Sequence, residues 1–359
     1  MDTENAKTAG TAGTAEITKR TQRTQRTEHT EHTARRTDRQ VLLGRIAVAA
    51  CAPYLLLKLL WVLGSDIGVV DLAGTSRGSW IAVNAVTFLM DAVAAAVAYT
   101  LTRPSGLRAP AWLLALPLWM ASGLLAPLML TVPAGSAVAA VTGAANPITS
   151  GDALQPWVFV LVYGAFIVEG CTLLGAFSVY AHRRWGVLLR RRLASEPAPA
   201  PGVRSARRLL GVPSALLLAV LGTVHVLWGL GMPAGAGAAA LPARTSVTAT
   251  SDVVLGLLSL AGAAGLTALL FPRRGPWRQL RTRVPLALAW VGSAAVFAWG
   301  GTLWLSWTAA DALTGGGEAP ARGLAGALEL AAGLVVLCLG ALTLAAETAR
   351  LPQVPPAAR

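Results

Sequence analysis

The stretch KLLWVLG, Lys58–Gly64, places a basic side chain inside an apolar run of helical length. A second stretch, HVLWGLG at His225–Gly231, has the same Trp and Gly at the same spacing, with His in the position of Lys. Two copies of one pattern in separate halves of a chain are typical of an internal repeat. An ionisable side chain at membrane depth is costly, so it marks either a functional site or a paired structural group.

The composition is that of a membrane protein. The 359 residues are 54% hydrophobic and 13% charged, whereas soluble domains carry about 25% charged residues. Long apolar runs recur, and in lipid they form helices because a helix satisfies its own backbone hydrogen bonds. We therefore predict an all-α, polytopic membrane protein with eight transmembrane helices. The expected spans are 42–63, 80–101, 111–132, 157–180, 209–231, 252–271, 284–307 and 324–347.

The predicted spans divide into two four-helix units. The first membrane repeat covers 40–181 and the second covers 209–348, and a basic, Pro/Ala-rich linker at 182–208 is expected to be extended. The polar tail at 1–39 has almost no apolar side chains, so we predict that it is disordered. Residues 349–359 form a second tail. Because each unit has an even number of helices, both units enter from the same side and the repeat is parallel.

The basic residues predict the orientation. Most of the 30 Lys and Arg residues lie in the tails and the loops on one side, and only Arg77, Arg244 and Arg322 lie in the loops on the other. We therefore expect both termini in the cytoplasm, in a bacterial cytoplasmic (inner) membrane, with the Arg clusters facing anionic lipid headgroups. This distribution argues against nucleic-acid binding despite the net charge of +13. The three Cys residues lie within apolar runs, which argues against a structural disulfide.

The motif His225-x-x-Trp228-x-x-Gly231 is followed by a Pro-containing loop and three further spans. In this it resembles a family of small four-helix actinobacterial membrane proteins that has no assigned activity. The resemblance covers about 209–348 and implies a four-helix membrane fold for that half. The first half departs from the motif because Lys58 stands where the family has His.

The candidate site consists of ionisable and aromatic residues within the spans. Lys58 and His225 are predicted at equal depth in the outer half of the bundle, with Asp91 and Glu169 nearer the middle. Charges at this depth are expected to pair. We expect Lys58 to pair with Asp91 or Glu169, and His225 to pair with the other carboxylate or with Glu329. The predicted catalytic set is Lys58, His225, Asp91 and Glu169, and the predicted substrate-binding set is Trp61, Trp228, Asn84 and Glu329.

Three functions fit these residues. The first expectation is a membrane-embedded acid/base enzyme of isomerase or epimerase type, with Lys58 and His225 on opposite sides of one cavity and no cofactor or metal. Its substrate would be a small or amphipathic molecule or a peptide. The second is a proton-coupled transporter or export permease that uses the same groups. The third is a structural or accessory subunit, in which the charges are satisfied pairs. The residues leave the oligomeric state open.

Overall fold

The computed structural model of the protein describes residues 38–72, 76–103, 106, 110–143, 153–195, 199, 201–234, 245–314 and 320–348. Within these ranges, eight helices are long and apolar enough to cross a membrane. They are the first helix (Asp38–Val62), α2 (Arg77–Thr102), α3 (Ala111–Thr142), α4 (Pro156–Arg190), α5 (Pro201–Gly229), α6 (Ser246–Leu270), α7 (Arg283–Thr314) and α8 (Pro320–Thr348). Two short 3-10 helices, η2 (Leu193–Ser195) and η4 (Pro276–Gln279), lie in the connections. The predicted all-α, eight-span class is confirmed.

Every predicted span coincides with one helix, and most helices continue beyond the apolar run. The clearest case is α3, which continues to Thr142 although Pro117, Pro127 and Pro133 lie inside it. Transmembrane helices tolerate Pro because neighbouring groups satisfy the freed backbone atoms. The predicted tails at 1–39 and 349–359 lie outside the described residues, except for residues 38 and 39, which begin the first helix.

The linker predicted as extended at 182–208 is largely helical. α4 bends at Trp185, where φ is −123° and ψ is 22°, and then runs on to Arg190, while α5 already begins at Pro201. Val, Leu and Arg residues past the bend are compatible with a helix, so α4 does not stop where the apolar run stops. The segment between the helices is tied to the α6–α7 connection, because the Leu193 N–H donates to the Leu280 carbonyl at 3.0 Å.

The first helix and α5 end in the same turn. Gly64 and Gly231 have φ angles of 100° and 86°, which an L side chain rarely adopts. Their N–H groups donate to the carbonyls of Trp61 at 3.1 Å and Trp228 at 3.0 Å. The next N–H groups reach back five residues, from Ser65 to Leu60 and from Met232 to Leu227, both at 2.9 Å. This is the Schellman pattern in both copies, and it explains the shared Gly. We call this end of the bundle the glycine end.

The shared Trp residues close the two turns in the same way. The Trp61 indole N–H donates to the carbonyl of Ile67 at 2.8 Å, and the Trp228 indole N–H donates to the carbonyl of Ala234 at 3.0 Å. In each copy the acceptor lies six residues after the Trp. Both indoles are buried, at 3% and 2% exposure. The repeat predicted from the two heptapeptides is therefore a repeat of local structure, with one indole bond holding each connecting loop onto its helix.

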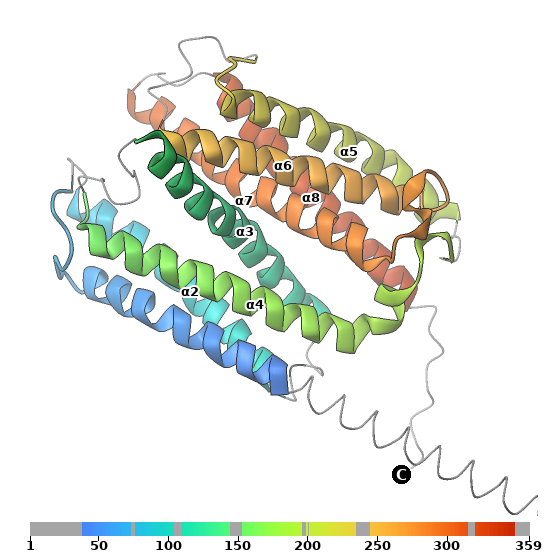
Figure 1. Ribbon diagram of the computed structural model, residues 1–359, viewed down its shortest axis with the longest axis horizontal. Helices are drawn as coiled ribbons and strands as arrows, with labels where there is room; N and C mark the ends of the chain where they lie inside the picture. Colours follow the sequence, from blue (N-terminus) through green and yellow to red (C-terminus); the bar gives the residue numbers. More distant parts are fainter. Residues whose placement is uncertain are drawn as a thin grey trace, which may run out of the picture.

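The two four-helix units meet along α3 and α7. Figure 1 shows α3 running between α4 and the helices of the second unit, and α3 packs against both α6 and α7. The indole of Trp119 on α3 donates to the Ser293 hydroxyl on α7 at 3.1 Å, and the indole of Trp290 on α7 donates to the Ser122 hydroxyl on α3 at 3.0 Å. Each helix thus offers the same Trp-x-x-Ser pair to the other, which places a local two-fold axis between them.

Gly123 permits this close contact. A Cβ atom on Gly123 would lie 2.2 Å from the carbonyl oxygen of Ala294 on α7, which is too short for any side chain without movement of the backbone. We expect Gly123→Ala to lower the free energy of unfolding by about 1–3 kcal/mol, the usual cost of overpacking. The measurement is thermal unfolding of the purified protein in detergent.

Gly164→Ala is the matched control, because a Cβ atom at Gly164 on α4 meets nothing within 4 Å. This control should leave stability unchanged or raise it slightly, since Ala favours the helix over Gly. Equal stability of the two variants would show that the α3–α7 contact is looser than described.

Candidate functional site

His225 lies between two carboxylates in the second unit. From α5, its Nδ1 atom lies 3.1 Å from Oδ1 of Asp252 on α6, and its Nε2 atom lies 2.9 Å from Oε1 of Glu329 on α8. The side chains of His225 and Glu329 are 3% and 0% exposed, and that of Asp252 is 16% exposed. Three helices therefore converge on one imidazole, and each ring nitrogen faces a carboxylate.

The cluster continues to Arg322. Nη2 of Arg322 lies 3.7 Å from Oδ2 of Asp252, and the guanidinium lies 5.1 Å from the ring centre of Trp228. The Trp228 ring in turn contacts the His225 ring edge to face, with ring centres 4.9 Å apart. Arg322 is the most exposed member of the cluster, at 23% of its side chain. Exposure thus falls step by step from Arg322 through Asp252 and His225 to Glu329.

Two glycines explain how Glu329 reaches this position. A Cβ atom on Gly300 of α7 would lie 2.5 Å from Cβ of Glu329 and 2.9 Å from its Oε2 atom. A Cβ atom on Gly326 of α8 would lie 2.6 Å from the carbonyl oxygen of Gly300. Small residues let helix backbones approach closely. The Gly300–Gly326 crossing therefore allows α8 to carry a carboxylate into a space that a larger residue on α7 would fill.

The geometry of this cluster suits proton exchange. A protonated imidazole donates from both nitrogens, whereas a neutral one donates from a single nitrogen and accepts at the other. Between two carboxylates, His225 can therefore hold a proton or pass it from one side to the other. Nε2 of His225 and Oε1 of Glu329 lie at ion-pair distance but are not aligned for a hydrogen bond, and Oε2 of Glu329 is likewise buried without a hydrogen bond within the described part of the chain. Such a group is costly to bury without a partner, so it is available for a proton or a ligand.

Lys58 in the first unit has different neighbours. Its Nζ atom donates to the Thr87 hydroxyl on α2 at 2.5 Å and lies 4.8 Å from the ring centre of Tyr54. The residue is 6% exposed, so it is buried within the protein. The predicted ion pair of Lys58 with Asp91 or Glu169 is not formed among the described residues, because Thr87, one turn before Asp91 on α2, takes the ammonium.

The two central carboxylates of the first unit lie in its interior. Glu169 is 3% exposed. Oδ2 of Asp91 is buried and makes no hydrogen bond in the residues that the structure describes. Lys58 interacts electrostatically with Asp91 without contacting it closely enough for an ion pair. The first unit therefore holds the amine of Lys58 and the carboxyl group of Asp91 near each other but without an ion pair.

The four residues predicted to bind substrate have simple outcomes. Trp228 and Glu329 join His225, as predicted for the second unit. Trp61 does not stack on Lys58, and its ring packs on Trp80 with ring centres 5.3 Å apart. The Asn84 side chain donates to the carbonyl of Trp80 on its own helix at 2.9 Å. Trp61 and Asn84 therefore have structural contacts.

Lys58 and His225 are not brought together. They belong to the first helix and α5, which lie at opposite edges of the bundle with α3 and α4 between them (Figure 1). The single cavity with these two residues on opposite faces is therefore not formed. The reason is that the units contact each other through α3, which packs against α6 and α7, so the first helix and α5 stay apart.

Sequence reasoning missed Asp252 and Arg322. The predicted span began at 252, so Asp252 counted as a boundary residue, whereas α6 begins at Ser246 and places it about 1.7 turns inside the helix. Arg322 counted as a loop residue, whereas α8 already includes it. A Thr-x-x-Thr capping box at Thr245 and Thr248 marks the true start of α6. Within the described ranges, no group of three or more metal-binding side chains has the geometry of a metal site.

The pairing of His225 is open to a stability test. We expect His225→Leu to lower the free energy of unfolding by roughly 3–5 kcal/mol, because it leaves the buried carboxylate of Glu329 without its partner. The double variant His225→Leu/Glu329→Leu removes the most deeply buried carboxylate as well and should recover part of the loss. Unfolding of the three proteins in detergent measures both effects. A single variant as stable as the double variant would contradict this pairing.

Known proteins provide no further guide to this site. No family model matches the chain, and no curated protein and no solved structure is significantly similar to it. The resemblance of residues 209–348 to a family of four-helix actinobacterial membrane proteins therefore stays a prediction. The case for a function depends on the cluster around His225 and on the separate environment of Lys58.

Proposed function

We propose that the protein is a proton-coupled membrane transporter, and that the second unit carries its proton site. The observation that supports this is the Asp252–His225–Glu329 chain, which leads from a partly exposed carboxylate to a fully buried one. Chains of Asp, Glu and His inside membrane helices are the groups through which pumps and transporters relay protons. Protonation of Glu329 from the glycine end would change the charge of the bundle interior and bias its conformation.

The same geometry disfavours His225 as a base that acts directly on a substrate. A catalytic base needs a free lone pair within hydrogen-bond reach of the proton that it removes. Both ring nitrogens of His225 face carboxylates of the protein, at 3.1 Å and 2.9 Å. His225 is therefore proposed as a carrier between two acids. The substrate class remains that of a small or amphipathic molecule.

The interface of the two units suits such a cycle. The Trp119–Ser293 and Trp290–Ser122 hydrogen bonds join the units around a local two-fold axis. In transporters with parallel repeats, the halves move as rigid bodies around a site. We propose that these paired bonds act as the pivot. The charge on the Asp252–His225–Glu329 chain would then decide which position of the units is favoured.

A pH jump across proteoliposomes tests the relay without knowledge of the substrate. The wild-type protein should give a transient proton current, and Glu329→Gln or His225→Gln should reduce it about a hundredfold or more, as expected when an essential proton-transfer group is lost. His182→Gln is the matched control, because His182 lies near the end of α4 and, among the described residues, its ring forms a hydrogen bond with the carbonyl of Ser178 on its own helix. Currents of wild-type size in both Glu329→Gln and His225→Gln would contradict the proposal.

A second candidate is the cofactor-independent acid/base enzyme of isomerase or epimerase type. The observation in its favour is the first unit, where Lys58 and Asp91 lie near each other without an ion pair and Oδ2 of Asp91 makes no hydrogen bond. An amine and a carboxyl group held apart can serve as acid and base on a substrate between them. In that case Lys58→Ala would abolish turnover and leave the pH-jump current intact. A structural subunit would give neither turnover nor current.

We propose further that both termini lie in the cytoplasm of a bacterial cell, with the glycine end outside and the Arg clusters at the cytoplasmic headgroups. The excess of Lys and Arg at the opposite end supports this orientation. Green fluorescent protein fused after Arg359 should therefore fluoresce, and alkaline phosphatase fused after Met232 should be active, because phosphatase folds only outside the cytoplasm. The opposite result for both fusions would reverse the orientation.

A further inference from the structure

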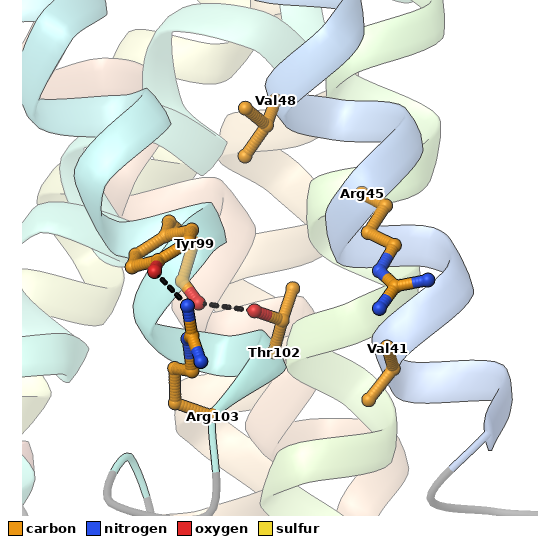
Figure 2. A pocket seen from close by; sticks show the side chains of 6 residues that line it. All are labelled: Val41, Arg45, Val48, Tyr99, Thr102 and Arg103. Carbon is orange, nitrogen blue, oxygen red and sulfur yellow. Dashed lines mark hydrogen bonds between the residues drawn. The ribbon is translucent and has the colours of Figure 1, made fainter.

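A groove separates the first helix from α2 at the end of the bundle where the first helix begins. Figure 2 shows its lining, and its volume is about 380 Å³. The first helix contributes Val41, Arg45 and Val48, and the end of α2 contributes Tyr99, Thr102 and Arg103. This groove lies far along both helices from the glycine end, so it is separate from the ionisable clusters already described.

Two arginines are among the residues that line this groove, one from each helix. Arg45 belongs to the first helix and Arg103 is the residue that caps α2 (Figure 2). No carboxylate lines the groove. Neither arginine forms an ion pair with Asp or Glu in the described part of the chain. Two uncompensated positive charges across a space of this size form a site for an anion.

Arg103 is already held in position. Its guanidinium donates to the Tyr99 hydroxyl and lies 4.7 Å from the centre of the Tyr99 ring. The Thr102 hydroxyl donates to the carbonyl of Tyr99 at 2.6 Å. These contacts order one wall of the groove, whereas Arg45 makes no hydrogen bond within the described residues. The Arg103 side chain would therefore lose little conformational entropy when an anion binds to it.

The remaining walls indicate the chemistry of the anion. Val41 and Val48 give the groove an aliphatic side, and the same helix exposes Leu42 and Ile46 at 59% and 38%. An exposed apolar surface on a membrane helix faces acyl chains. An inorganic anion uses only the arginines, whereas a phospholipid uses the arginines for its phosphate and the valines for its chains. Basic pockets between transmembrane helices bind acidic lipid headgroups in this way.

We propose that this groove binds one anionic phospholipid, with its phosphate between Arg45 and Arg103 and an acyl chain along Val48. The lipid joins the first helix to α2. It thereby reinforces a contact in which a Cβ atom on Gly44 would already lie 2.6 Å from the methyl group of Thr102. The site is independent of the proton relay, since it lies in the other unit and at the other end of the bundle.

Retention of lipid by the full-length protein tests this site. The protein is reconstituted in vesicles of phosphatidylcholine with or without phosphatidylglycerol and extracted in mild detergent. Its bound lipid is then identified by native mass spectrometry. Each arginine near an anionic lipid contributes about fivefold in affinity, so Arg45→Gln/Arg103→Gln should retain phosphatidylglycerol about thirtyfold less than wild type. Arg45→Gln alone, which breaks no described contact, should retain it about fivefold less.

The matched control is Arg273→Gln/Arg274→Gln, which removes two exposed arginines from the same end of the second unit. This control should retain phosphatidylglycerol as wild type does. Equal retention by the control and the Arg45→Gln/Arg103→Gln variant would overturn the site. A soluble phosphate site is the alternative source of the same chemistry. If inorganic phosphate displaces the bound phosphatidylglycerol, the ligand is a free phosphate and the lipid proposal is wrong.

Discussion

The cost of an unpaired polar group in hydrocarbon governs this structure. It requires that the apolar segments form helices, because only helices satisfy their backbone groups without water. The same cost acts on the side chains. His225 is held by two carboxylates, and Lys58 by a hydroxyl and an aromatic ring. The indoles of Trp61 and Trp228 are likewise buried with a carbonyl partner each. The few buried atoms without a partner, such as Oε2 of Glu329, are therefore informative.

Close backbone contacts decide where these polar groups meet. Gly300 and Gly326 let α8 approach α7, and this approach carries Glu329 to His225. Gly123 lets α3 approach α7, and this approach joins the two units. Small residues thus act at two levels, within the second unit to build the ionisable cluster and between the units to fix their common axis. Removal of side-chain volume from selected positions is what makes the charged interior possible.

Much of the fold follows from the sequence, and much of the site does not. Apolar length alone predicts all eight helices, and the paired heptapeptides predict a repeat, whose two copies end in the same turn at Gly64 and Gly231. Asp252 was not predicted as a site residue because apolar length does not locate the polar first turns of a helix. The capping box at Thr245 is the better signal for the start of α6. The partner of Lys58 was not predicted correctly because Thr87 and Asp91 lie one turn apart on α2. The orientation of α2 about its axis decides which of the two contacts the ammonium group. The separation of Lys58 from His225 depends on how the two units pack, which no local sequence pattern contains.

The reciprocal Trp119–Ser293 and Trp290–Ser122 bonds have a consequence for the history of the chain. A contact in which each side offers the same residues to the other is the isologous contact of a symmetric dimer. A four-helix ancestor with one Trp-x-x-Ser pair on its third helix would form the same contact with a second copy of itself. If two such copies were fused, each half would be free to change its residues independently of the other. One half of the present protein then carries Lys58 beside Thr87, and the other carries His225 between two acids.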